Sequence, residues 1–329
     1  MKLLYRLLTM LLILIILTGC GEMFGGNKTH ERSKFYLYAM NPDGSDKDKI
    51  CKLGNLEGDA LFGDFLSFFR VSPDAKYLSG WFGYDDFKVI ELETGEVVVH
   101  NSIEERSIYP EFSADSKYVT FAKNSYLYLL NLETEQESET FYEDLGEFPF
   151  FADDTHLIFS RRSINSNQIQ VISKNINSGA NEILYSFDQD RKLNHIRIKD
   201  GSLYLLNVSS YSGAIRKVDL NTGQYFDSNY LLGNQPFEIS PGGDKIVGTS
   251  TSNYMLRVIS TDGMDYNDIY RGGNGVFINN SDIVFEDEGK VRVGRFDGSG
   301  DSKLTSNFPF YYNTTQNKIY YIKEKKIYE

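Results

Sequence analysis

Two short polar turns alternate seven times along the chain, and this repeat limits the possible folds more than any other feature. The first turn has the pattern SPDAKY at Ser72–Tyr77, and the second has the pattern LETGEV at Leu92–Val97. Glycine in the second turn can adopt the positive φ that a tight hairpin needs. The other first turns are Ser113–Tyr118, Ala152–Leu157, Lys199–Tyr204, Ser240–Ile246, Ile278–Ile283 and Asn313–Ile319, and the other second turns are Asn41–Asp46, Leu132–Glu137, Ile176–Asn181, Leu220–Tyr225, Thr261–Tyr266 and Phe296–Asp301. A period of this size indicates stacked supersecondary units.

The segments between the turns read as β-strands. They alternate polar and apolar residues and are rich in Tyr, Phe, Ile and Val, as in Tyr126–Leu132 and Lys290–Phe296. Each unit is therefore predicted to be a four-stranded antiparallel meander, with strands a to d from the inside outward. The a–b and c–d turns then lie at one end of the assembly, and the b–c and d–a loops lie at the other.

The two turn types are out of phase, which predicts a closed ring. The first c–d turn precedes any a–b turn, and the last a–b turn has no complete c–d turn after it. A composite blade explains this, with Phe35–Leu53 as its outer strands and Phe308–Ile322 as its inner ones. Closure covers strand edges that would otherwise pair with other chains. We expect an all-β propeller of seven four-stranded blades; because Lys325–Tyr328 could add a strand, six or eight blades remain alternatives.

The turn residues carry a family resemblance. Phe69–Leu78, Phe112–Phe121 and Phe237–Val247 have an aromatic residue, a Ser-(Pro)-Asp type turn and a following strand. This pattern is similar to the PD40 repeat of TolB-like, WD40-like β-propellers. The resemblance implies a propeller over nearly the whole mature chain. It is specific for the fold and weak for function, because one fold hosts many functions.

The N-terminus predicts export and lipidation. Lys2 and Arg6 precede an apolar run, Leu7–Leu17, that is too short to span a membrane and fits a signal peptide. The following Leu-Thr-Gly-Cys resembles the bacterial lipobox, which implies a diacylated Cys20; the alternative is an ordinary export signal that ends in cysteine. The expected segments are a signal peptide at 1–19, a flexible tether at 20–33 and the propeller at 34–329. The expected location is the bacterial cell envelope, lipid-anchored on the extracytoplasmic side.

Composition narrows the partners. The formal charge is −12 and no Lys/Arg-rich cluster exists, which argues against nucleic acid as a ligand. An acidic chain is not held at an anionic membrane by charge, so acyl chains would have to hold it. After Cys20 the only cysteine is Cys51, so no internal disulfide is possible and Cys51 is expected to be a small apolar filler. The propeller is expected to be monomeric.

Motifs for chemistry are sparse. The four histidines lack metal-ligand spacing, and HExxH, CxxC and GxSxG do not occur. Asp74, Asp115, Asp154 and Asp244 recur in the a–b turns, where Asp bonds to nearby backbone, so a turn role explains the repetition. Neither Asp43–Asp48 nor Asp297–Asp301 has the spacing of a calcium-binding EF-hand loop. No cofactor, metal ligand or catalytic residue is therefore predicted.

The variable b–c and d–a loops are the predicted binding face, since function tends to lie on variable loops held by a rigid scaffold. Tyrosine and arginine are enriched at binding hot spots. The candidate residues of that kind on this face are Tyr84, Arg161, Arg162, Arg191, Tyr211, Tyr230 and Arg271. The favoured function is a non-catalytic binding or scaffold module for a protein, peptide or glycan. The alternative is an envelope enzyme, a lyase or glycan hydrolase, that uses acidic residues of the central channel.

Overall fold

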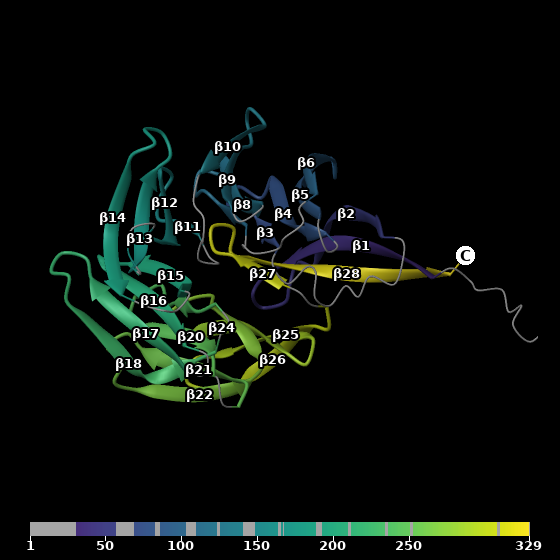
Figure 1. Cartoon of the computed structure of the whole chain (residues 1–329). Helices are drawn as coiled ribbons and strands as arrows, with labels where there is room; N and C mark the ends of the chain where they lie inside the picture. The colour runs from purple at the N-terminus through teal and green to yellow at the C-terminus, as the bar shows by residue number, and fades with distance from the viewer. Residues whose placement is uncertain are drawn as a thin grey trace, which may run out of the picture.

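Seven four-stranded antiparallel sheets form a ring in the computed structural model (Figure 1). The structure describes residues 31–56, 69–82, 86–102, 110–123, 126–140, 149–163, 166, 168–188, 193–209, 212–233, 236–250, 253–307 and 310–328. The predicted all-β fold with seven blades is confirmed. Within these ranges, no helix has the length and apolar character needed to cross a membrane.

The blades are numbered in chain order, each from its inner strand outward. Blade 1 consists of β3 (Arg70–Val71), β4 (Tyr77–Phe82), β5 (Asp86–Glu91) and β6 (Val97–Ser102). Blade 2 consists of β7 (Glu111–Phe112), β8 (Tyr118–Lys123), β9 (Tyr126–Asn131) and β10 (Gln136–Thr140). Blade 3 consists of β11 (Phe150–Phe151), β12 (His156–Arg162), β13 (Gln168–Asn175) and β14 (Asn181–Asp188). Blade 4 consists of β15 (Leu193–Lys199), β16 (Ser202–Ser209), β17 (Ser212–Asp219) and β18 (Tyr225–Leu232). Blade 5 consists of β19 (Glu238–Ile239), β20 (Lys245–Thr249), β21 (Met255–Ser260) and β22 (Tyr266–Arg271). Blade 6 consists of β23 (Gly273–Phe277), β24 (Asp282–Asp287), β25 (Lys290–Arg295) and β26 (Asp301–Thr305). Blade 7 is β27 (Phe310–Asn313), β28 (Lys318–Tyr328), β1 (Glu31–Met40) and β2 (Asp48–Leu56).

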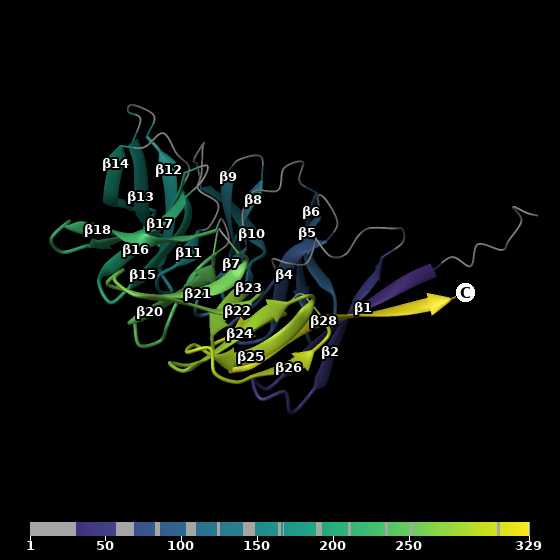
Figure 2. The same cartoon turned by 90° about the horizontal axis from the view of Figure 1, so that it is seen from below.

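Blade 7 joins the two ends of the chain, as predicted. β28 pairs with β1 along its length, from Met40 opposite Ile319 to Glu31 opposite Tyr328. Residues 325–328 are thus the end of β28 and not a further strand, which leaves the blade count at seven. β1 begins at Glu31, just before the expected start of the propeller at residue 34. The β1–β28 ribbon projects from the ring in both views (Figures 1 and 2).

Hydrogen bonds between neighbouring a–b turns also close the ring. The side-chain amide of Asn313 in blade 7 donates to the carbonyl oxygen of Ser72 in blade 1, at 2.9 Å. The backbone N–H of Asp74 in blade 1 donates to the hydroxyl of Ser116 in blade 2, at 3.0 Å. The first of these bonds joins residues near opposite ends of the chain, so it forms only in the closed ring.

A buried serine holds the a–b turn in the blades that keep the Ser-(Pro)-Asp pattern. The Ser72 hydroxyl accepts hydrogen bonds from the backbone N–H groups of Lys76 (3.1 Å) and Tyr77 (2.9 Å) and donates to the Asp74 carboxylate (2.7 Å). Ser113 and Ser240 make the corresponding contacts in blades 2 and 5, and all three serines are buried. Asp74, its equivalent Asp115 and the corresponding Asp244 are therefore turn residues, as predicted.

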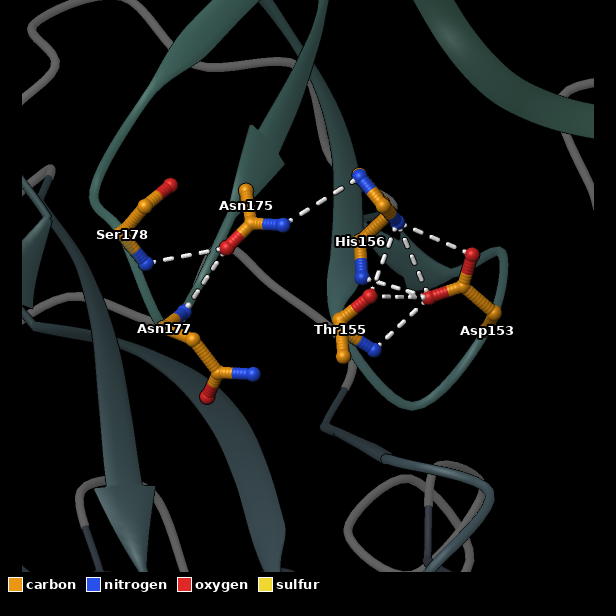
Figure 3. A network of polar contacts seen from close by, with 6 residues as sticks. All are labelled: Asp153, Thr155, His156, Asn175, Asn177 and Ser178. Atoms are coloured by element: carbon orange, nitrogen blue, oxygen red, sulfur yellow. Dashed lines mark hydrogen bonds and ion pairs between the residues drawn. The ribbon is translucent and has the colours of Figure 1, made fainter.

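Blade 3 departs from this pattern and corrects one assignment, because Asp153 and not Asp154 closes its turn (Figure 3). The Asp153 carboxylate accepts from the backbone N–H (2.7 Å) and hydroxyl (2.9 Å) of Thr155 and from the backbone N–H of His156 (2.8 Å). The His156 ring nitrogen Nδ1 lies 2.9 Å from the same carboxylate. Partial burial opposes ionisation, but these hydrogen bonds outweigh it and lower the pKa of Asp153 to about 2. The c–d turn beside it is closed in a similar way by Asn175, which accepts from two backbone N–H groups.

The core lies between adjacent blades, so each blade depends on its neighbours. Phe87 of blade 1 stacks on Phe121 of blade 2 with ring centroids 4.6 Å apart, and Trp81 packs into the same cluster. Burial of a large aromatic side chain contributes about 2–3 kcal/mol through the apolar area removed from water. Cys51 is buried, as expected for an apolar filler, and burial raises the pKa of its thiol to about 11.

Candidate binding site

A cavity of about 380 Å³ lies along the axis of the ring. Residues of all seven inner strands line it, from β3 of blade 1 round to β27 of blade 7. The inner strands run from the d–a loops to the a–b turns, so the predicted loop face surrounds one mouth of this central channel.

One position of the repeat contributes a residue to the channel wall from every blade. It lies two residues before the residue that opens each a–b turn. In blades 1 to 7 this position is occupied by Arg70, Glu111, Phe150, Arg197, Glu238, Val276 and Tyr311, and each of these lines the channel. The order around the ring brings an aromatic residue, an arginine and a glutamate together twice.

The first such set is Tyr311, Arg70 and Glu111, from blades 7, 1 and 2. The Arg70 guanidinium lies 5.3 Å from the centre of the Tyr311 ring, and its Nε donates to Oε1 of Glu111 at 3.4 Å. Its Nη1 donates to the carbonyl oxygen of Phe69 at 3.2 Å. Stacking and hydrogen bonding together fix the plane of the guanidinium.

The second set repeats this arrangement with Phe150, Arg197 and Glu238, from blades 3, 4 and 5. The Arg197 guanidinium lies 5.5 Å from the centre of the Phe150 ring, and its Nη2 donates to Oε1 of Glu238 at 2.9 Å. Its Nη1 donates to the carbonyl oxygen of Ile196 at 3.0 Å. We call these two sets the channel triads. Blade 6 contributes smaller groups to the wall, Asn274, Gly275 and Val276.

Burial and charge set the protonation of the groups in the channel. Burial alone would lower the pKa of Arg70, but the Glu111 carboxylate outweighs it and raises the pKa above the usual range. Burial raises the pKa of Tyr311, and Glu111 raises it further, so the hydroxyl stays protonated. Arg70 therefore stays charged beside Glu111, and the Tyr311 hydroxyl stays neutral.

His195 lies behind the wall of blade 4 and is neutral. Burial, followed by the charges of Arg197 and Arg70, holds the pKa of this imidazole well below its usual value. Its Nδ1 accepts a hydrogen bond from the backbone N–H of Phe237 at 3.2 Å, and its ring packs edge-on against that phenylalanine. His195 therefore ties β15 to the start of β19 and supports the second channel triad.

Three of the residues predicted from the loops, Arg161, Arg162 and Arg271, are described and lie apart from the channel wall. Arg161 and Arg162 end β12, and Nε of Arg161 donates to Gln170 within blade 3 at 3.2 Å. Arg271 ends β22 in blade 5, and its guanidinium is exposed and lies 3.9 Å from Glu288 of blade 6. The topology places all three at the predicted loop end, where Arg161 contacts its own blade and Arg271 contacts the adjoining one.

The remaining predictions concern positions that the structure does not describe in full. Tyr230 lies within β18. Tyr84, Arg191, Tyr211 and the predicted lipid attachment site Cys20 lie outside the described residues.

The loop-based prediction did not include the channel triads, although the sequence holds a signal for them. Once the seven a–b turns are aligned, Arg and Glu stand at one fixed offset from the turn in four of the seven repeats. The inner strands β3, β7, β11 and β19 have only two residues each, so no periodic pattern marks them. The offset becomes informative only when the ring places these strands around a common axis.

Comparison with solved structures shows that the chain shares its β-propeller fold with TolB and with other propellers. TolB from Acinetobacter baumannii superposes with a TM-score of 0.52 at 20% identity, over 77% of this chain and 66% of TolB. BamB from Moraxella catarrhalis gives 0.54 at 13% identity, over 83% of this chain and 88% of BamB. An oligogalacturonate lyase in complex with manganese superposes with a TM-score of 0.51 at 14% identity, over 71% of this chain and 75% of the lyase. No protein-family model and no curated protein sequence matches the chain. The predicted TolB-like resemblance is confirmed at the level of the fold.

Proposed function

We propose that this protein is a lipid-anchored β-propeller of the bacterial cell envelope that binds a protein, peptide or glycan without catalysing a reaction. The two channel triads are the observation that carries the proposal. They repeat one set of contacts in blades 1 and 4, within a cavity at the lower end of the range of about 300–1,000 Å³ typical of ligand sites. A repeated set of oriented donors and acceptors is suited to recognition of a ligand.

The contacts of the carboxylates favour binding over catalysis. Glu111 and Glu238 each accept a hydrogen bond from a guanidinium, an arrangement that holds both groups as fixed hydrogen-bonding partners. His195 is neutral and its Nδ1 is occupied by a backbone N–H group. The two glutamates are therefore held in place to orient a ligand in the channel, while His195 packs behind the wall and takes no direct part.

Anchoring is supported by the resemblance of the sequence around Cys20 to a lipobox. β1 is strand c of blade 7 and begins at Glu31, so the chain enters the propeller at the end that carries the b–c and d–a loops. A tether from Cys20 to Glu31 would turn this loop face toward the membrane. The a–b and c–d turns would then face away from it.

Metabolic labelling with a fatty acid tests the anchor. Wild type should carry label and partition into membranes, and Cys20→Ala should lose both properties. Label retained by Cys20→Ala would contradict lipidation at this residue and leave an unmodified export signal as the better explanation.

Crosslinking and recovery of partners from membranes tests the binding function. We expect Arg70→Gln/Arg197→Gln, in the channel, to lose partners, and the exposed Arg295→Gln to retain them as a matched control. Arg161→Glu/Arg162→Glu tests the loop face, and loss with this variant alone would move the site to the loops. Equal recovery with every variant would reject both locations.

The enzyme alternative is favoured by one observation, the structural likeness to an oligogalacturonate lyase. Incubation of the purified protein with envelope polysaccharides tests it. Turnover that is lost in Glu111→Gln or Glu238→Gln would replace the binding proposal with a catalytic one.

A further inference from the structure

The charges in the central channel cancel. Among the described residues that line it, the charged ones are two arginines, Arg70 and Arg197, and two glutamates, Glu111 and Glu238. Each arginine is paired with one glutamate of the next blade. A ligand carboxylate that approached either guanidinium would also approach a glutamate, and a ligand ammonium would meet an arginine beside either glutamate. Like charges in such a half-buried site repel strongly, so the channel selects against both kinds of ion.

Each channel triad still offers one hydrogen-bond donor group beside one acceptor. A guanidinium has five N–H groups, and the described contacts of Arg70 and Arg197 use two nitrogens each. The same contacts use Oε1 of each glutamate, which leaves Oε2 as an acceptor. Two adjacent hydroxyl groups complement such a pair, because one can accept from arginine while the other donates to glutamate.

Aromatic rings complete the wall. Besides Phe150 and Tyr311 of the triads, the lining rings are Phe112, Phe151, Phe310 and Tyr312. A pyranose ring has apolar C–H faces and hydroxyl groups at its edge, so it can contact aromatic carbon and an Arg–Glu pair together. The two triads come from different halves of the ring, blades 7, 1 and 2 and blades 3, 4 and 5, and suit a ligand in which the same unit occurs twice.

A peptide fits this wall less well. Extended peptides are usually bound by main-chain hydrogen bonds along a free strand edge. The inner strands β3, β7, β11 and β19, which carry three of the four charged channel residues, are two residues long. In these four blades the inner edge is too short to pair with a peptide over several residues; the longer inner strands, β15, β23 and β27, belong to blades 4, 6 and 7.

We propose that the central channel binds a short neutral oligosaccharide, with one sugar unit at each channel triad. The proposal rests on the binding function proposed above and names its ligand class. It also separates this channel from one that accepts a polyuronate, because an acidic sugar would meet Glu111 or Glu238 at each position where an arginine could hold it.

Titration of the wild-type propeller with trisaccharides tests this selection. The probes are maltotriose, cellotriose and chitotriose, which are neutral, with trigalacturonate as the acidic probe and acetylated, amidated tetraalanine as the peptide probe. Calorimetry and saturation-transfer NMR should show at least one neutral sugar binding tenfold or more tightly than trigalacturonate and the peptide. Tighter binding of trigalacturonate, tighter binding of the peptide, or no binding of any neutral sugar would each overturn the proposal.

Two channel variants separate charge from geometry. Glu111→Gln/Glu238→Gln leaves the two arginines unbalanced, so binding of trigalacturonate should rise tenfold or more relative to the neutral sugar. Arg70→Lys keeps the charge but removes the planar fork, so binding of the neutral sugar should fall severalfold with no gain for trigalacturonate. Glu182→Gln, on an exposed position of β14, is the matched control and should leave every affinity unchanged.

Melting curves show whether each variant folds. If Glu111→Gln/Glu238→Gln does not fold, the proposal is tested with Arg70→Lys, which is the smaller change. An unchanged preference in folded Glu111→Gln/Glu238→Gln would contradict selection by these charges. If no sugar binds but Arg70→Gln/Arg197→Gln still loses its crosslinked partners, the ligand class is wrong and the proposed binding function stands.

Discussion

Every repeat contains a residue that opens the a–b turn and a channel residue two positions earlier, and the two positions differ in what they hold. In blades 1, 2 and 5 the turn position is a buried serine with the same hydrogen bonds. The channel position in the same blades is Arg70, Glu111 and Glu238. The turn position satisfies groups of its own blade, so the same solution works in each. The channel position faces the axis, where its partners come from other blades.

Folding stability and the proposed recognition of a ligand therefore depend on different positions of the repeat in this propeller. Removing a turn serine strands buried backbone N–H groups, whereas changing a channel residue alters a half-buried wall beside a cavity. Mutation of a turn serine should therefore lower stability strongly and affect the proposed binding little. Mutation of a channel residue should affect the proposed binding strongly and lower stability little.

Deletion of residues 308–329 should abolish the cooperative unfolding transition. It removes β27 and β28, so β1 keeps only β2 as a partner, and blades 6 and 1 lose the inner half of the blade that lies between them. Both kinds of position depend on the closed ring, and circular dichroism with size-exclusion chromatography should show an unfolded or associated chain. A monomeric deletion variant that melts like the parent would show that closure by blade 7 is dispensable.

Ser113→Ala should lower the free energy of unfolding by about 1–3 kcal/mol, the cost of leaving buried polar groups unsatisfied. The Ser113 hydroxyl accepts from the backbone N–H of Tyr118 at 2.9 Å and donates to Asp115 at 2.7 Å. Urea denaturation measures the change. Ser186→Ala on the exposed strand β14 is the control and should change stability by less than about 0.5 kcal/mol. Equal effects of the two substitutions would remove the distinction drawn for the turn serine.

Glu111→Gln, two residues before Ser113, should lower the free energy of unfolding by about 1 kcal/mol or less, because it removes the charge of the pair but leaves Arg70 a hydrogen-bond acceptor. Glutamine keeps an oxygen that can accept from Arg70, and both side chains of the pair border the channel. The same denaturation experiment applies, run beside Ser113→Ala. A loss as large as that of the serine variant would mean that the channel wall carries folding stability and would end the comparison.

Asp153→Asn should give a small, pH-dependent effect. The pKa of Asp153 is lowered to about 2 in the fold from an ordinary 3.8, so its stabilisation is complete above about pH 4 and is lost as the pH falls through about 2. The side chain is 57% exposed, so screening keeps the effect below about 1 kcal/mol. The difference in melting temperature between wild type and variant should shrink from pH 6 to pH 2. Asp154→Asn removes an equal charge without these turn hydrogen bonds and should lower the melting temperature less at pH 6; equal effects would contradict the assignment of Asp153.

Local chemistry explains why much of the fold could be predicted. Turn signals such as Ser72–Tyr77 act within a few residues, and their phase along the chain implies that blade 7 is built from both ends. The same reasoning failed where two residues could serve equally, as at Asp153 and Asp154, because the hydrogen-bond geometry of the turn decides between them.

The candidate site could not be predicted from local sequence in the same way. The loop residues chosen from composition, such as Arg161 and Arg271, contact their own or adjoining blades, while the channel triads join residues from three blades each. The turn signals and strand alternation, which act over a few residues, were enough to predict antiparallel four-stranded blades and closure through both chain ends, and they favoured seven blades over six or eight. The pairing of β28 with β1 fixed the count at seven, and the contacts of Arg70 with Tyr311 and Glu111 also emerge only in the folded ring. These contacts arise from the angle between blades and the closure of the ring, and no local pattern of residues encodes that geometry.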